Sequence, residues 1–400
     1  MSAGKRIAAT RGSGIAPLVI AAFAALPGAG HAQVAWNSHG YLRAGPGLAS
    51  RGDDHACYQL PGADFKYRLG NECDLYGEFL FSVTQGPQDG RQFRLDYMPT
   101  VFQGTEPGDG KFYAAQFYGE ASGLSFAPQA SFWIGKRYHR GADVHIVDTY
   151  FEKLDGTGLG ASVPVLGGKL DLAYYHSDHS GQPMAHRLNG WLRDMPVNEG
   201  GSLNVLLGLT QATGPGGNAG ASLSVRHHQK FDETTSNNLW FQAARGTAGP
   251  DGNFGDLAAG SDLKRWRLVD GFQFQPTARF GGQAIAMFEQ RKSDAGDATV
   301  ASLGGRVSYA FTRHFKLLGD VGFDRVKPDG SPGRQLTKVT VAPTWTQGEA
   351  FSARPELRLF VTHASWNRAA EVAAGAGGLA GLGDGKTSGT SVGLQLETWW

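Results

Sequence analysis

Aromatic and charged side chains share strand faces in this sequence, and that combination could serve a binding chemistry. Tyr41 has the same parity along the chain as Arg43, and Tyr76 has the parity of Glu78. Two tryptophans near the C-terminus, Trp366 and Trp399, also fall with polar neighbours. Because successive side chains of a strand point to opposite faces, each ring would lie beside hydrogen-bonding groups. Rings stack on the apolar face of a sugar and polar groups hold its hydroxyls, so the pattern favours carbohydrate binding. The alternative is an aromatic girdle at a lipid interface.

The elements that would carry these residues are strands, because the hydrophobic pattern after Gln33 has a period of two. Clear examples are 315–324, 356–363 and 391–400, in which apolar residues alternate with charged or polar ones. Glycine- and proline-rich stretches of turn composition separate such segments. The pattern predicts an all-β protein.

Composition narrows the class further. The chain has 400 residues, and its 37 basic residues balance 36 acidic ones, so no basic field argues for nucleic acid. Aromatic residues make up 11% of the chain, which is too many for a disordered protein. The sequence therefore predicts a folded protein without a nucleic-acid partner.

The N-terminus has the features of a secretory signal peptide. Lys5, Arg6 and Arg11 precede an uncharged apolar run from about Ile15 to Leu26, which is too short to span a membrane. Small residues then lead to Ala32, a suitable cleavage site. We therefore expect residues 1–32 to be a signal peptide and residues 33–400 to form one domain.

Export makes the two cysteines interpretable. Cys57 and Cys73 are the only cysteines of the chain. An even number in an exported protein favours a disulfide, which would close a short loop. Two separate thiols are the alternative.

An exported protein whose strands alternate apolar and polar residues fits either a soluble β-sandwich or a transmembrane β-barrel. A barrel turns its apolar face to lipid and its polar face to a lumen. The signal peptide, the charges on nearly every polar face and the amphipathic last strand ending in Trp400 favour the barrel. Chain length allows both 16 and 18 strands.

Several motifs resemble those of the maltoporins, trimeric 18-stranded sugar porins of Gram-negative outer membranes. His39 to Gly45 resembles the family's first strand, and Cys57 with Lys66 to Cys73 resembles its disulfide loop. Gly135 to Tyr150 is similar to its inward-folded constriction loop. The segment from Arg354 to Trp366 and the terminal Trp399 and Trp400 resemble its last strands.

The resemblance implies an outer-membrane barrel of 18 antiparallel strands with roles for matching residues. The family's aromatic slide corresponds to Tyr41, Tyr76, Trp366 and Trp399. Its polar track corresponds to Arg43, Arg68, Glu78, Asp143 and Asp148, and its constriction tyrosine to Tyr150.

The sequence also departs from the family. The loop at 102–112 has no counterpart of the entrance tryptophan that the family borrows from a neighbouring subunit. Gly141 stands where the constriction loop carries an arginine, with Arg140 beside it. These departures leave the length and identity of the sugar open.

The resulting functional hypothesis is passive, facilitated diffusion of maltose, maltodextrins and other carbohydrates across the outer membrane. It includes no enzymatic step, no cofactor and no metal. The expected partners are oligosaccharides, two further copies of the chain in a homotrimer, and outer-membrane lipid and lipopolysaccharide. Alternatives are a porin of the same fold with another or weak selectivity, a barrel hydrolase that uses Ser391 and a histidine, and a soluble lectin.

Overall fold

The computed structural model describes residues 33–49, 55–86, 90–104, 108, 110–177, 184–213, 217–294, 296–374 and 385–400. The expected signal peptide lies outside these residues. The strands are β1 (Gln33–Ala44), β2 (Gly47–Ala49), β3 (Leu75–Gly86), β4 (Gln92–Gln103), β5 (Lys111–Leu124), β6 (Ala127–Arg140), β7 (Asp143–Val144), β8 (Thr149–Tyr150), β9 (Lys153–Val165), β10 (Gly168–His176), β11 (Ala185–Asn198), β12 (Gly201–Ala212), β13 (Ala219–Lys230), β14 (Ser236–Gly246), β15 (Lys264–Thr277), β16 (Phe280–Lys292), β17 (Ala298–Thr312), β18 (Phe315–Pro328), β19 (Arg334–Thr346), β20 (Glu356–Trp366) and β21 (Ser388–Trp399). The helices are a 3-10 turn, η1 (His145–Val147), and α2 (Arg368–Ala374).

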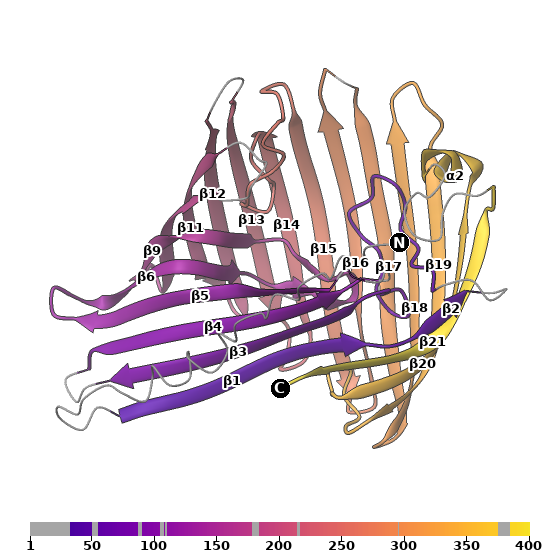
Figure 1. Ribbon diagram of the computed structural model, residues 1–400, viewed down its shortest axis with the longest axis horizontal. Coiled ribbons are helices and arrows are strands. Elements are labelled where there is room, and N and C mark those ends of the chain that lie inside the picture. Colours follow the sequence, from indigo (N-terminus) through magenta and orange to yellow (C-terminus); the bar gives the residue numbers. More distant parts are fainter. Residues whose placement is uncertain are drawn as a thin grey trace, which may run out of the picture.

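The sheet closes on itself to form a barrel (Figure 1). Neighbouring strands pair antiparallel in chain order, and β21 returns to pair with β1, where Tyr41 lies opposite Trp399. Strand β2 continues β1 along the same edge of β21, so the two together count as one strand of the barrel wall. The nineteen strands of this sheet in the described residues therefore form an 18-stranded barrel. The predicted 18-stranded antiparallel barrel is confirmed.

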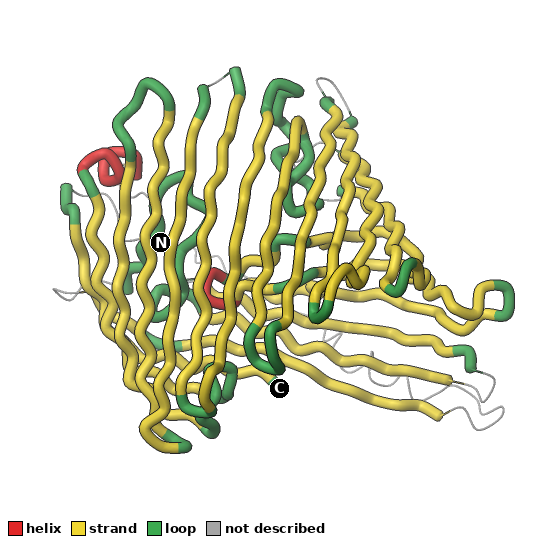
Figure 2. The backbone as a smooth tube through the Cα atoms, turned by 180° about the vertical axis from the view of Figure 1, so that it is seen from behind, coloured by secondary structure: helices red, strands yellow, loops and turns green. Residues whose placement is uncertain are grey.

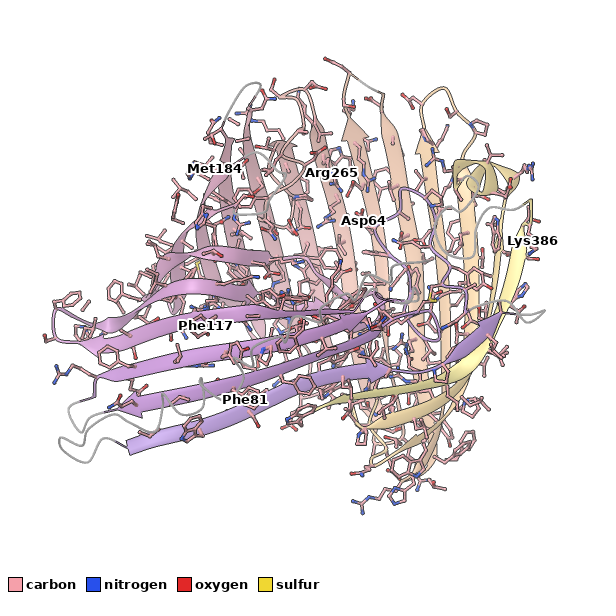
Figure 3. The ribbon with its side chains drawn as sticks, viewed as in Figure 1. Asp64, Phe81, Phe117, Met184, Arg265 and Lys386 are labelled. Carbon is pink, nitrogen blue, oxygen red and sulfur yellow. A yellow bond between two sulfur atoms is a disulfide. The ribbon has the colours of Figure 1, made fainter. Side chains whose placement is uncertain are left out.

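Polarity across the barrel wall is the reverse of that in a soluble protein. In β18, Lys316 and Asp320 point inward and are buried, whereas Val321 and Phe323 point outward and are exposed. Phe81 and Phe117 likewise project from the outer face (Figure 3). An apolar outer band around a polar interior is the pattern of a membrane-spanning barrel.

The two ends of the barrel differ. At one end neighbouring strands join through tight turns such as 166–167, 199–200 and 313–314, whereas the other end carries the longer connections (Figure 2). Short turns face the periplasm and long loops face outward in barrels of this kind. No helix in the described parts of the chain is long and apolar enough to cross a membrane.

Two of the long connections fold into the barrel. Residues 55–74, the disulfide loop, are closed by a bond between Cys57 and Cys73. Residues 141–152, the inward loop, contain β7, η1 and β8. Apolar side chains of both loops pack together against inward residues of β14 to β20, and this burial holds them inside the lumen. The packed residues include Leu60, Phe65, Tyr67, Val144, Ile146, Phe151, Trp240, Val269 and Ile285.

Candidate functional site

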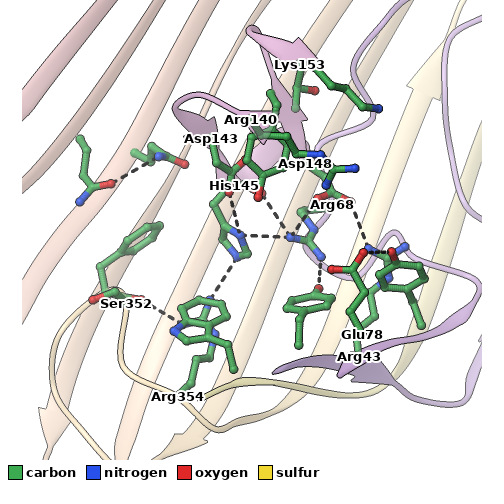
Figure 4. Close-up of a pocket in the computed structure, with 18 of the residues that line it drawn as sticks. Arg43, Arg68, Glu78, Arg140, Asp143, His145, Asp148, Lys153, Ser352 and Arg354 are labelled. Carbon is green, nitrogen blue, oxygen red and sulfur yellow. Dashed lines mark hydrogen bonds and ion pairs between the residues drawn. The ribbon is translucent and has the colours of Figure 1, made fainter. Parts of the chain in front are cut away.

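A cavity of about 780 Å³ lies inside the barrel between the inward loop and the opposite wall (Figure 4). Strands β1, β3, β4, β6, β9 and β21, the two infolded loops and the turn at 347–355 all contribute to its lining. Nine of the residues expected at the site line it, namely Tyr41, Arg43, Arg68, Tyr76, Glu78, Asp143, Asp148, Tyr150 and Trp399. Further lining residues include Phe102, Arg140, His145, Lys153, Phe351 and Arg354.

The inward loop narrows the lumen because both its ends and its centre are anchored. At its base, the Gly141 amide donates to the Glu152 carbonyl at 2.8 Å. At its centre, the Ile146 amide donates to the side chain of Gln283 at 3.1 Å, and the Ile146 carbonyl accepts from the Arg68 amide at 3.0 Å. The apolar side of η1 therefore faces the core, while the polar side chains of β7 and β8 line the cavity.

Aromatic rings and guanidinium groups alternate along one wall of the cavity. The rings of Tyr41 and Tyr76 have centroids 6.2 Å apart. The guanidinium carbon of Arg68 lies 5.6 Å from the Tyr41 ring centroid, and that of Arg43 lies 5.1 Å from the Tyr76 centroid. Trp399 stacks with Arg354, whose guanidinium carbon is 3.8 Å from a ring centroid. Flat apolar faces thus lie next to fixed hydrogen-bond donors.

A continuous network of ion pairs fixes these donors. Arg43 pairs with Glu72 at 2.9 Å and with Asp148 at 3.1 Å, and Arg68 pairs with Glu397 at 3.2 Å. In the described residues the network joins five cations to an equal number of carboxylates. They are Arg43, Arg68, Lys316, Arg354 and Arg358 with Glu72, Asp74, Asp148, Glu356 and Glu397. A balanced and largely buried network holds side chains in fixed positions, and removal of one of its buried partners would leave a buried charge.

Protonation states in the inward loop follow from burial and these neighbours. Burial, together with the charge of Asp148, raises the pKa of Asp143 to about 7. Burial lowers the pKa of His145 to about 4, so this imidazole is neutral at physiological pH. Although burial opposes it, the guanidinium groups of Arg68 and Arg43 hold the pKa of Asp148 below its ordinary value.

The structure places one expected aromatic residue away from the cavity. Trp366 ends β20 near the loop end of the barrel and is buried against Tyr58, with ring centroids 5.8 Å apart. Two other rings line the cavity instead, Phe102 at the end of β4 and Phe351 in the turn at 347–355. Strand parity could not indicate Phe351 because it lies in a turn.

The structure leaves no room for a side chain at Gly141. A Cβ atom on Gly141 would lie 2.3 Å from a carboxylate oxygen of Glu152, which pairs with Arg226 in the barrel wall at 2.9 Å. Arg140 extends into the cavity instead, held by Asp155 at 2.5 Å, with its guanidinium carbon 5.0 Å from the Tyr150 ring centroid. A guanidinium group from the end of β6 therefore lies beside Tyr150 of the inward loop.

Ser391 and the two cysteines make contacts of a structural kind. The Ser391 hydroxyl donates to the Ala56 carbonyl at 2.9 Å and lies 3.2 Å from the Tyr58 hydroxyl. In the part of the chain that the structure describes, neither of these hydrogen-bond partners is a histidine. His55, Cys57 and Cys73 form a group with metal-ligand spacing. Both sulfur atoms are already in the disulfide, so this group does not offer thiolate ligands.

Comparisons with known proteins agree with this architecture. The family description LamB porin matches residues 37–400. A maltoporin of Hahella chejuensis is 28% identical, with 96% of this chain and 97% of that protein aligned. Among solved structures, Pseudomonas aeruginosa OccK3 has a TM-score of 0.52 at 11% identity, covering 91% of this chain and 95% of that one. The anion-selective porin from Comamonas acidovorans has a TM-score of 0.51 at 12% identity, covering 92% and 100%. These two likenesses extend to the fold alone, whereas the family match spans nearly all of the barrel, and the chain belongs to the LamB family of outer-membrane porins.

Proposed function

We propose that this porin admits carbohydrates by facilitated diffusion, with oligosaccharides of the maltodextrin type as its substrates. One observation carries the proposal. The rings of Tyr41, Tyr76 and Trp399 line the same cavity as the guanidinium groups of Arg43 and Arg68. Pyranose rings present an apolar face for stacking and a rim of hydroxyls that need hydrogen-bond partners. The slide in this proposal consists of these three rings together with Phe102 and Phe351.

Passive transport requires binding that is repeated and weak. Each ring and each charged group of the cavity offers a partial site, so a glycan can exchange one set of contacts for the next. Glu78, Asp143 and Asp148 accept hydrogen bonds from hydroxyls, and the arginines donate them. Arg140 supplies the guanidinium that the Gly141 substitution removes from the constriction. No chemical step is part of the proposal.

The proposal also covers the setting of the channel. The chain would reach the outer membrane after removal of residues 1–32, and three copies would assemble into a homotrimer. The support is the family membership and the apolar outer wall. Phe102 adds a ring to the cavity from the subunit's own chain.

Single-channel conductance in a planar bilayer, titrated with maltohexaose, tests the proposal. We expect stepwise openings that the sugar closes saturably. Trp399→Ala should weaken maltohexaose binding about tenfold, because a lost stacking partner is worth roughly 1.5 kcal/mol. Trp399→Phe, which keeps a ring, should retain most of the affinity.

Trp366→Ala is the matched control, since this tryptophan lies outside the cavity. If maltohexaose does not change the conductance, the protein is a porin without specificity for maltodextrins. Equal losses for the Trp366 and Trp399 variants would contradict the assignment of the slide to the cavity.

A further inference from the structure

Three basic side chains form an unpaired row on the outer surface of the barrel. Arg245, Lys264 and Lys292 lie at the loop ends of β14, β15 and β16, and all three are exposed. Their strand parity directs them outward, whereas Arg265 and Arg291 beside them point into the lumen and pair with Glu289. Within the described residues none of the three has an ion-pair partner.

The register brings the three charges side by side. Arg245 is opposite Lys264 in the β14–β15 pair, and Lys264 is opposite Lys292 in the β15–β16 pair. Like charges directly across a ladder repel one another and destabilise the sheet. A row with no internal counter-charge is therefore a surface that an external anion would stabilise.

The row lies at the level of lipid headgroups. Outward aromatic rings mark the turn end of the same wall, among them Phe272 on β15 and Phe280 on β16. The strand segment from Lys264 to Phe272 crosses part of the membrane, and so does the segment from Phe280 to Lys292. At the usual strand tilt each segment spans about 20–30 Å along the membrane normal. That distance matches the apolar band of an outer-membrane barrel, so the cations lie at its outer boundary.

An apolar groove continues the row along the same register. Arg245 is opposite Ala221, Ala221 is opposite Leu209, and Leu209 is opposite Leu188. These four residues line an outer groove of about 520 Å³. Leu188 and Leu209 also line a second groove of about 610 Å³ that extends over Leu159 and Leu172. Small Ala221 between larger side chains leaves a slot that begins at a guanidinium group.

We infer that this surface binds a phosphorylated glycolipid of the outer leaflet, with phosphate on the basic row and an acyl chain in the groove. Phosphate supplies the counter-charge that Arg245, Lys264 and Lys292 lack, and guanidinium and ammonium groups both bind it well. The acyl chain covers the exposed leucines and fills the slot at Ala221. A lipid with headgroup and chains at these two positions fits an outer leaflet, because the row is at the loop end of the barrel. Sugar transport does not enter this argument, since every residue involved faces away from the lumen.

Native mass spectrometry of the purified protein in detergent, titrated with bisphosphorylated lipid A, tests the inference. The variant combines Arg245→Gln, Lys264→Gln and Lys292→Gln. We expect an affinity loss of about 100-fold for three basic groups at a membrane surface. The matched control combines Lys169→Gln, Lys230→Gln and Arg313→Gln, exposed cations at the turn end, and should bind like the wild type.

A second variant tests the groove without changing charge. Ala221→Trp fills the slot and should weaken lipid A binding about tenfold even if the triple variant does not fold. Dephosphorylated lipid A and phosphatidylglycerol should both bind more weakly than bisphosphorylated lipid A.

Equal binding of all three lipids, or equal losses in the row and control variants, would overturn the inference. Dissociation of the oligomer in the row variant with unchanged lipid affinity would overturn it too, because the row would then be a subunit contact. Conductance and maltohexaose block should be unchanged in the row variant, which separates this inference from the proposed sugar slide.

Discussion

Asp143 lies where the inward loop narrows the lumen, and its surroundings place its ionisation near neutral pH. Burial and the Asp148 carboxylate raise its pKa to about 7, against the opposing effect of Arg68 and Arg140. The neighbouring imidazole of His145, 3.8 Å away, stays neutral because burial lowers its pKa to about 4. Asp143 is thus mostly neutral at pH 5.5 and mostly ionised at pH 8.5. One negative charge appears in the cavity as the pH rises.

We predict that this charge changes ion selectivity. Cation permeability relative to anion permeability should rise between pH 5.5 and pH 8.5, because a carboxylate in the narrow part of the lumen attracts cations. The reversal potential under a potassium chloride gradient measures the change. Asp143→Asn should remove most of it, and the same pH response in the Asn variant would refute the assignment.

Asp148→Asn gives a second, distinguishable outcome. Asp148 keeps a low pKa beside Arg68 and Arg43 and is ionised at both pH values. Its replacement should make the pore less cation-selective throughout. Because its charge also raises the pKa of Asp143, the midpoint of the pH response should move to lower pH.

At the scale of elements, the disulfide loop is held in the lumen by a notch in the barrel wall. Gly304 on β17 and Gly322 on β18 are paired across the sheet, and the Tyr67 ring lies over both. A Cβ atom would lie 2.2 Å from this ring at Gly304 and 2.1 Å from it at Gly322. The absence of side chains at these two positions therefore makes room for the loop that carries Arg68 into the cavity.

We predict that Gly322→Ala displaces Tyr67 and destabilises the protein by roughly 1–3 kcal/mol, the usual cost of overpacking. The thermal unfolding midpoint should fall, and single-channel noise should increase as the disulfide loop loosens. Gly319→Ala on the same strand is the matched control, since the nearest atom to its Cβ is 3.7 Å away. Similar unfolding midpoints for the two variants would show that the notch does not hold the loop.

The elements also show how far the sequence predicts this protein. Alternation of apolar and polar residues predicted the strands, and the family motifs pointed to nine of the residues that line the cavity. Parity placed Trp366 correctly on the inner face, yet it says nothing about height along the barrel, which depends on the stagger of all the strands. Trp366 therefore lies closer to the loop end of the barrel than the cavity does, and there it packs on Tyr58.

Irregular backbone was the other obstacle to prediction. The β4–β5 ladder shifts register so that Met98 faces Gln116 while Pro99 faces Ala114, which leaves Ala115 as an extra residue. The shift brings Tyr113 opposite Thr100 in the row of Glu78, on the lumen face. Simple alternation from Gln116 would have put Tyr113 outside. Phe351, in a turn, has no parity at all.

At the scale of the whole molecule, closure of the barrel depends on a short strand pair, that of β1 with β21. Strand β1 pairs with β3 from Gln33 to Arg43, but with β21 only from Tyr41 to Ala44. Mutual backbone hydrogen bonds between Gly40 and Trp400, at 3.2 and 3.3 Å, extend this seam by one step. Among the described residues nothing pairs with the other edge of 33–39. An open strand edge is costly in lipid, so the stability of the seam limits the stability of the barrel.

The ring of Trp400 strengthens the seam from outside. It crosses Gly40, where a Cβ atom would lie 2.2 Å from it, and contacts the Phe79 ring with centroids 5.9 Å apart. We predict that Gly40→Leu displaces this ring and weakens closure. Heating in detergent, followed by electrophoresis, should then convert the folded band to the unfolded one at a temperature several degrees lower than in the wild type. Gly190→Leu, at an outward glycine of β11 whose nearest neighbour is 3.7 Å away, should leave this temperature unchanged. If both variants unfold with the wild type, the terminal ring does not hold the seam, and closure depends on the backbone pairing of β1 and β2 with β21.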